Sequence, residues 1–148
     1  MEERFKKFTV SMTKIRRSIQ RIKTEEMAEY NLKSPHVSCL YYLYEEGALT
    51  AKELCDICDE DKASVSRSIV QLENEGYVVC PSDGKKRYKV QIELTEKGRA
   101  IAEELARKID RVLESAGYGL TEENRVVFYQ SLELISRNLE EICKNYDK

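Results

Sequence analysis

The chain contains few of the residues on which many structural classes depend. Its 148 residues include 2 prolines, 6 glycines, no tryptophan and one histidine. With 41% apolar and 35% charged residues, the chain is too apolar to be disordered and too poor in turn formers for an all-β sandwich. The composition therefore predicts a mostly helical protein, and 148 residues can bury one core without disulfide or metal staples.

Long hydrophobic runs are also missing. The longest nearly apolar run, Val37 to Tyr44, is too short to cross a bilayer, and eight Lys or Arg are spread through the first 23 residues. We therefore expect a soluble cytoplasmic protein with no membrane partner. The 5 cysteines are odd in number and lack framework spacing, which predicts free thiols in a reducing compartment.

Groups for catalysis or metal binding are scarce. Cys55 and Cys58 have Cys-x-x-Cys spacing, but a zinc site would need two more ligands and a thioredoxin-like site a βαβ context. His36 is expected to be a capping or surface residue. With no glycine-rich phosphate loop and scattered acids, the sequence predicts no enzyme, no metal and no cofactor.

The thiols are interpreted as structural. Those on helical apolar positions are expected to pack as small apolar groups: Cys39, Cys55, Cys58 and Cys143. Cys80 is expected to be the most exposed. Because the pair Cys55 and Cys58 should face inward, it is a poor arrangement for a low-pKa thiolate that attacks peroxide.

Charge is distributed unevenly along the chain. The formal net charge is -2, yet residues 1–23 carry +6 and residues 62–99 carry +3. Basic residues gather in one short stretch, with Asp83 as the nearby acid: Lys85, Lys86, Arg87 and Lys89. This stretch is a candidate contact for a polyanion, and the alternative is a solvated turn.

Both ends of the chain carry regular apolar stripes at steps of three and four. The first stripe comprises Phe5, Phe8, Met12, Ile15, Ile19 and Ile22. The last comprises Phe128, Leu132, Ile135, Leu139, Ile142 and Tyr146, in a helix that Thr121 should begin. These helices are not needed for a compact core, so we expect them to pack on each other and on a second subunit. The alternative is a monomeric bundle.

The middle of the chain reads as a helix-turn-helix. Thr50 and Glu53 form a capping box for a short helix that ends near Cys58. Asp61 can cap the next helix, with Gly76 at its left-handed end. The buried stripe of this helix is expected to be Val65, Ile69 and Leu72. A connection of about three residues between two helices is what this motif requires.

The flanking segments complete a winged motif. Ser34 is expected to cap a helix whose first residue is Pro35, and Gly47 should end it. Residues 77–80 and 88–94 have strand composition, with Asp83-Gly84 as the turn between them. Thr95 should cap a further helix that ends by Gly117.

The outer face of the helix after Asp61 suits DNA. It presents Ala63, Ser64, Arg67, Gln71 and Asn74. Arginine can pair with guanine, glutamine with adenine, and serine with a base or a phosphate. Glu73 and Glu75 make this helix slightly acidic, so phosphate affinity must come from Lys62, the basic hairpin, the N-terminal helix and dimerisation. An ordinary solvated surface remains the alternative for Gln71 and for Asn74.

The order and spacing of several motifs resemble one family. These motifs are Leu49-Thr50-x-x-Glu53-Leu54, Asp61-Lys-Ala-Ser-Val-Ser-Arg67, Leu72-Glu-Asn-Glu-Gly-Tyr77 and Leu94-Thr-Glu-Lys-Gly-Arg99. Together they look like the winged helix-turn-helix core of the MarR (multiple antibiotic resistance regulator) family. The resemblance covers essentially the whole chain.

The resemblance implies a mainly α fold with a small β-hairpin. A winged helix-turn-helix core at 34–99 would be flanked by dimerisation helices at 1–33 and 118–148, with residues 100–117 linking them in one domain over 1–148.

It also implies a homodimer that binds double-stranded DNA, with Ser64, Ser66 and Arg67 in the major groove and Arg87 at the wing tip. The full set of expected DNA-binding residues is Lys62, Ser64, Ser66, Arg67, Gln71, Lys85, Lys86 and Arg87. Where the family has an acid two residues before the wing arginine, this chain has Lys85.

The favoured function is a ligand-responsive repressor that binds a pseudo-palindromic operator as a homodimer and responds to a small-molecule effector. One alternative is a thiol-based redox sensor on the same fold, and another is a helical interaction module without DNA binding. Four tyrosines could line an effector pocket, although a core role is the better interpretation: Tyr30, Tyr41, Tyr42 and Tyr44.

Overall fold

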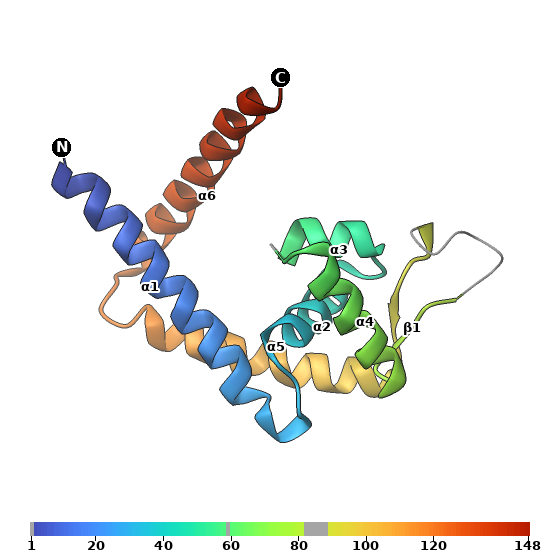
Figure 1. Ribbon diagram of the computed structural model, residues 1–148. Helices are drawn as coiled ribbons and strands as arrows, with labels where there is room; N and C mark the ends of the chain where they lie inside the picture. Colours follow the sequence, from blue (N-terminus) through green and yellow to red (C-terminus); the bar gives the residue numbers. More distant parts are fainter. Residues whose placement is uncertain (1, 59, 82–88) are drawn as a thin grey trace. The chain divides into compact units, whose positions relative to one another are not determined.

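The computed structural model describes residues 2–58, 60–81 and 89–148 (Figure 1). Its elements are α1 (Glu2–Glu26), η1 (Ala28–Tyr30), α2 (Ser34–Glu46), α3 (Ala51–Cys58), α4 (Lys62–Asn74), β1 (Val78–Val79), β2 (Glu93–Leu94), α5 (Glu96–Ala116), α6 (Glu122–Lys144) and η3 (Asn145–Asp147). The expected fold class, mainly α with a small antiparallel hairpin, is confirmed. Among the described residues, no helix has the length and hydropathy that a membrane span needs.

The chain divides into two compact units, residues 1–109 and 110–148. The first unit contains the helix-turn-helix, the hairpin and the core. The second contains the end of α5 and the whole of α6. The single domain expected over residues 1–148 stays a prediction.

The helix ends follow from local hydrogen bonds. The Thr50 hydroxyl accepts the Glu53 backbone N–H at 3.2 Å, and the Glu53 carboxylate accepts the Thr50 N–H at 3.3 Å. Asp61 accepts the Ser64 N–H at 2.7 Å, and Gly76 adopts a φ of 79°, in the left-handed region. The expected capping box, α4 cap and α4 end are all confirmed.

The start of α2 differs by one residue from the sequence prediction. Lys33, rather than Ser34, is the N-cap, with extended φ and ψ of -103° and 169°. The reason is His36, whose Nδ1 accepts the Lys33 backbone N–H at 3.0 Å. A side chain three residues into the helix thus satisfies the amide that precedes it.

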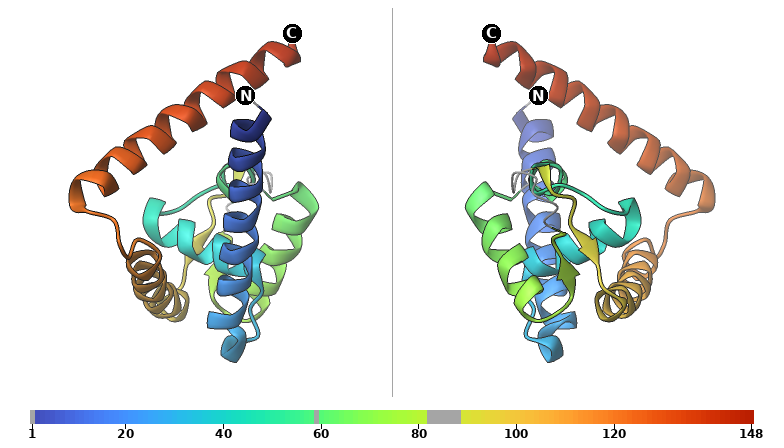
Figure 2. Two further views of the ribbon diagram at one scale, coloured as in Figure 1. Left: turned by 90° about the vertical axis from the view of Figure 1, so that its left-hand side faces the viewer. Right: turned by 90° about the vertical axis from the view of Figure 1, so that its right-hand side faces the viewer.

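The core of the first unit surrounds α2. Its fully buried side chains include Met27, Leu32, Val37, Leu40, Leu54, Val65, Leu72, Val78 and Leu105. The predicted α4 stripe is buried as expected. The four tyrosines are half-buried and pack against this cluster, which agrees with a core role, and Tyr42 also lines a hollow beside α1. Figure 2 shows α3 and α4 in green and α2 in cyan from two sides.

The β-hairpin is shorter than predicted within the described residues. Val78 pairs with Leu94 and Val79 with Glu93, whereas strands over 77–80 and 88–94 were expected. The backbone of Ile92 bonds instead to Leu49, with N···O distances of 3.2 and 2.8 Å. The second strand therefore has two successive partners, and the ladder with β1 ends early. The predicted turn Asp83-Gly84 lies outside the described residues.

A tight joint connects α4, the hairpin and α5. The Thr95 hydroxyl donates to the Gly76 carbonyl at 2.6 Å and accepts the Gly98 N–H at 3.0 Å. The Lys97 ammonium donates to the Glu75 carbonyl at 2.8 Å. A Cβ on Gly98 would collide with the carbonyl oxygen of Tyr77. Glycine at this position lets the two backbones approach and fixes the end of α4.

The terminal helices leave apolar side chains exposed. On α1 these include Phe5, Phe8, Val10, Ile15 and Ile19. In the second unit they include Val126, Phe128, Ile135, Leu139, Ile142 and Tyr146, and none of residues 122–144 is buried. Thr121 caps α6 by accepting the Asn124 N–H at 3.1 Å, as predicted.

Candidate nucleic-acid interface

The helix α4 is held rigidly on the core by one side. Val65, Ile69 and Leu72 are buried, and the buried Ser68 donates its hydroxyl to the Ser64 carbonyl at 2.9 Å. Because the N-terminus is capped and the C-terminus is fixed by the Thr95 joint, the outer side chains have a defined backbone. This arrangement makes α4 a stable platform for recognition.

Three of the predicted DNA-binding residues lie together. Ser64, Arg67 and Gln71 line a hollow of about 540 Å³ with the first turn of α2, including Lys33 and His36. Ser64 and Gln71 are half-buried, whereas Arg67 is exposed. Of the remaining predicted residues of α4, Lys62 and Ser66 are exposed and do not line this hollow.

Gln71 is engaged by neighbours within the protein. Its Nε2 donates to a Glu75 carboxylate oxygen at 3.4 Å, and its side chain is hydrogen-bonded to His36. Since His36 Nδ1 accepts the Lys33 N–H, the neutral ring carries its hydrogen on Nε2 and Gln71 accepts it. Burial lowers the pKa of His36, which keeps the ring neutral. These bonds fix the glutamine amide at the edge of α4.

One exposed residue of α4 escaped the sequence analysis. Val70 is 41% exposed, and it lies one turn after Ser66 and beside Arg67 on the outer face. An exposed valine can contact the methyl group of thymine. The spacing of four residues from Ser66 could have indicated this position. The sequence analysis also did not place Lys33 and His36 beside α4.

The predicted basic wing falls outside the described residues. Lys85, Lys86 and Arg87 lie in the segment 82–88, and their roles stay predictions. The segments that flank this stretch are fixed. Val78 is buried on one side, and Val90 and Ile92 are buried on the other. The described residues on both sides of 82–88 are therefore anchored in the core.

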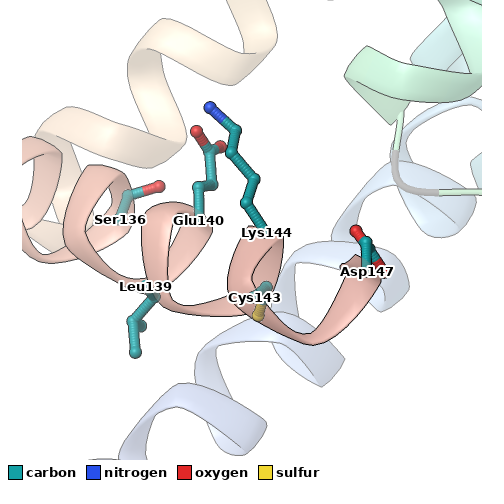
Figure 3. A pocket seen from close by; sticks show the side chains of 6 residues that line it. All are labelled: Ser136, Leu139, Glu140, Cys143, Lys144 and Asp147. Carbon is teal, nitrogen blue, oxygen red and sulfur yellow. The ribbon is translucent and has the colours of Figure 1, made fainter.

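The cysteines differ in part from their predicted roles. Cys39 is buried, as expected, but Cys143 is exposed and Cys80 is half-buried, so the expected order of exposure was wrong. In the described second unit, Cys143 has no core to enter. Figure 3 shows Cys143 and Leu139 on one side of α6, with Glu140 and Lys144 pointing elsewhere. The six residues around this shallow hollow come from α6 and η3 alone, so it is a helix surface.

Cys58 packs against the core as expected, but the direction of its pKa shift differs from the expectation of a poor thiolate former. A hydrogen bond from Cys39 and the nearby charge of Lys23 lower the pKa of Cys58, although burial and Glu60 oppose the shift. Burial instead raises the pKa of Cys55, which lies one turn earlier. The pKa values of the two thiols in the Cys-x-x-Cys pattern are therefore shifted in opposite directions.

The fold and this interface define a winged helix-turn-helix protein. Residues 30–87 match the model of the MarR family. A curated relative, the uncharacterized HTH-type transcriptional regulator YwaE of Bacillus subtilis (strain 168), is 27% identical over 131 residues, covering 86% of this chain and 77% of the relative. The chain is therefore similar to the MarR family in sequence over residues 30–87 and in fold over most of its length.

Two solved structures extend the comparison. A Listeria monocytogenes protein assigned to the MarR family and crystallised with a 26mer DNA has a TM-score of 0.81 and 24% identity, covering 90% of this chain and 89% of its own. The Bordetella bronchiseptica protein BpsR, whose DNA binding is regulated by 6-hydroxynicotinic acid, has a TM-score of 0.69 and 25% identity. The match covers 85% of this chain and 98% of BpsR.

Proposed function

We propose that this protein is a sequence-specific DNA-binding transcriptional regulator whose α4 enters the major groove. The observation that carries this proposal is the outer face of α4, where Ser66, Arg67 and Val70 are exposed on a helix fixed at both ends. These side chains can bond to a base or phosphate, pair with guanine and contact a thymine methyl. The Listeria monocytogenes protein of similar fold was crystallised with DNA, which supports DNA binding by this fold.

Phosphate contacts come from basic residues around this face. Lys62 lies at the first turn of α4, and the wing supplies Lys85, Lys86 and Arg87. The formal net charge of -2 leaves little long-range attraction to DNA, so these local cations carry the electrostatic part of binding.

The active form is a homodimer built on the terminal helices. In a single copy, α1 exposes Phe5 and Phe8 to water, and α6 exposes Phe128, Ile135 and Leu139. Burying one such side chain contributes about 1.5–3 kcal/mol, so several per subunit give a stable pair. A two-fold dimer places two α4 helices on half-sites about one helical turn apart, which predicts a pseudo-palindromic operator.

The regulator is a repressor that a small molecule releases from its operator. Control of BpsR by 6-hydroxynicotinic acid supports this ligand response. A ligand acts in this way when it binds the DNA-free conformation more tightly than the DNA-bound one.

Selection of bound sequences from a random DNA library tests the function and identifies the operator. We expect a pseudo-palindrome that binds at least about 10³-fold more tightly than random duplex. With four phosphate contacts per subunit, the slope of log affinity against log salt should approach about -7. Equal affinity for the selected and random duplexes would contradict the proposal.

A further inference from the structure

A cavity of about 340 Å³ lies between α1, α2 and α3 in the first unit. Its wall combines apolar side chains, among them Ile15, Ile19 and Tyr42, with the charged Arg16 and Glu60. Its polar lining includes Lys23, Ser38 and Cys58. The Lys23 ammonium donates to the Ser38 hydroxyl at 2.9 Å, which places its charge inside the cavity. The cavity gives a small molecule access to the Cys58 sulfur.

A second thiol lies behind Cys58. Cys39 of α2 is 1% exposed, and its side chain is hydrogen-bonded to Cys58 of α3. This bond and burial raise the pKa of Cys39, so Cys39 keeps its proton and donates it to the Cys58 sulfur. A donated hydrogen bond and the charge of Lys23 both favour the Cys58 thiolate. One half-buried thiol with a lowered pKa, Cys58, therefore lies beside one fully buried thiol, Cys39.

We propose that Cys58 and Cys39 form a redox couple, in which a hydroperoxide that enters the cavity converts the two thiols into a disulfide between α2 and α3. The Cys58 thiolate attacks the terminal peroxide oxygen, the O–O bond breaks, and the leaving alkoxide or hydroxide takes a proton from solvent. Cys58 becomes a sulfenic acid.

The second step closes the disulfide. The Cys39 sulfur attacks the Cys58 sulfur, and the sulfenic hydroxyl leaves as water with the Cys39 proton. One hydroperoxide is thus reduced by two electrons, and two thiols are oxidised to one disulfide. The hydrogen bond to Cys58 is the main cause of the raised pKa of Cys39. Oxidation of Cys58 removes this hydrogen bond, and the Cys39 thiol then loses its proton more easily.

The link between this couple and DNA rests on the proposed function. Cys58 is the last residue of α3, and Asp61, three positions later, caps α4. A new bond from Cys58 to Cys39 shortens their separation and moves the end of α3 towards α2. The start of α4, with Lys62 and Ser64, is then displaced from its groove position. We expect oxidation to weaken operator binding about tenfold or more, as loss of one bidentate base contact would.

The experiment follows the thiols of the full-length reduced protein during stepwise addition of hydrogen peroxide. Remaining thiols are alkylated in denaturant, and peptide masses locate the products. We expect a Cys39–Cys58 disulfide as the first product, reversed by dithiothreitol. In Cys39→Ala, oxidation should stop at a Cys58 sulfenic acid that dimedone traps. In Cys58→Ala, Cys39 should stay a thiol.

Cys55→Ala is the matched control, because Cys55 lies on the same short helix and does not line the cavity. This variant should form the disulfide at the parental rate. If Cys39→Ala does not fold, the pH dependence of iodoacetamide alkylation in the parent decides the reactivity, with Cys58 expected to react at lower pH than Cys55. First oxidation at Cys55, Cys80 or Cys143 would overturn the couple.

The DNA readout separates this proposal from the proposed function. Parent and Cys58→Ala are titrated on the selected duplex, before and after peroxide. Only the parent should lose affinity, and dithiothreitol should restore it. A disulfide that leaves affinity unchanged would overturn the regulatory role alone. If the reduced parent binds no DNA, the proposed function fails, and the mass map still decides the thiol chemistry.

Discussion

The buried His36 predicts a specific dependence of folding stability on pH. Burial is the largest cause that lowers the pKa of His36 in the folded state, with Lys33 adding to the shift and Glu75 and Gln71 opposing it. In the unfolded chain the pKa of histidine is about 6.5. Between these two values the unfolded state binds more protons, so the free energy of unfolding falls as pH decreases.

The size of this effect follows from linkage. The full contribution of the neutral ring is present above about pH 6.5, and it is lost as pH falls from there towards the folded pKa. The slope cannot exceed about 1.36 kcal/mol per pH unit for one group. His36 is the chain's one histidine, so no other imidazole contributes in this window.

His36→Asn isolates the titration from the cap. The asparagine oxygen can still accept the Lys33 N–H, but it does not titrate. Urea unfolding of parent and variant between pH 8 and 5 should show a slope near pH 6 in the parent alone. His36→Ala should lose a further 0.5–2 kcal/mol or so, since the cap is removed. Parallel curves for parent and His36→Asn would refute this assignment.

Four further changes test the interface and the assembly. Arg67→Ala should weaken operator binding by about 1–3 kcal/mol and random-duplex binding much less, whereas Arg99→Ala on α5 serves as the charge-matched control. Arg87→Ala should flatten the salt slope by up to about two in a dimer, measured on both duplexes. Gly98→Ala should lower the free energy of unfolding by about 1–3 kcal/mol or more, because its Cβ meets the Tyr77 carbonyl. Ile142→Asp should shift sedimentation towards monomer, and an unchanged dimer would contradict the use of α6 as an interface.

The features that sequence predicted well are those fixed by neighbours in the chain. Thr50, Asp61, Thr95 and Thr121 cap helices as expected, because each cap and its amide lie three residues apart. The buried stripe of α4 follows from helical periodicity in the same way. These elements depend on interactions between residues a few positions apart, so they can be predicted from a single sequence.

The features that sequence missed depend on contacts between distant segments. The Cys-x-x-Cys spacing suggests that Cys58 is paired with Cys55. In the structure, the side chain of Cys58 is hydrogen-bonded to Cys39 on another helix. Likewise, Ile92 pairs with Leu49, so the ladder between β1 and β2 is shorter than the sequence predicted. Neither contact leaves a periodic signal, because each joins segments that are far apart in the sequence.

The edge of α4 that faces α2 and the outer face of α4 should contribute differently to base recognition. Along the edge that faces α2, Gln71 is held by His36 and Glu75, and reading adenine would require breaking bonds that the fold has already made. Along the outer face, Arg67 and Val70 are exposed on a fixed backbone and can meet bases without that loss. Discrimination should therefore rest mainly on the outer face. Random-library selection with Gln71→Ala should return nearly the parental operator, whereas selection with Arg67→Ala should lose one guanine in each half-site.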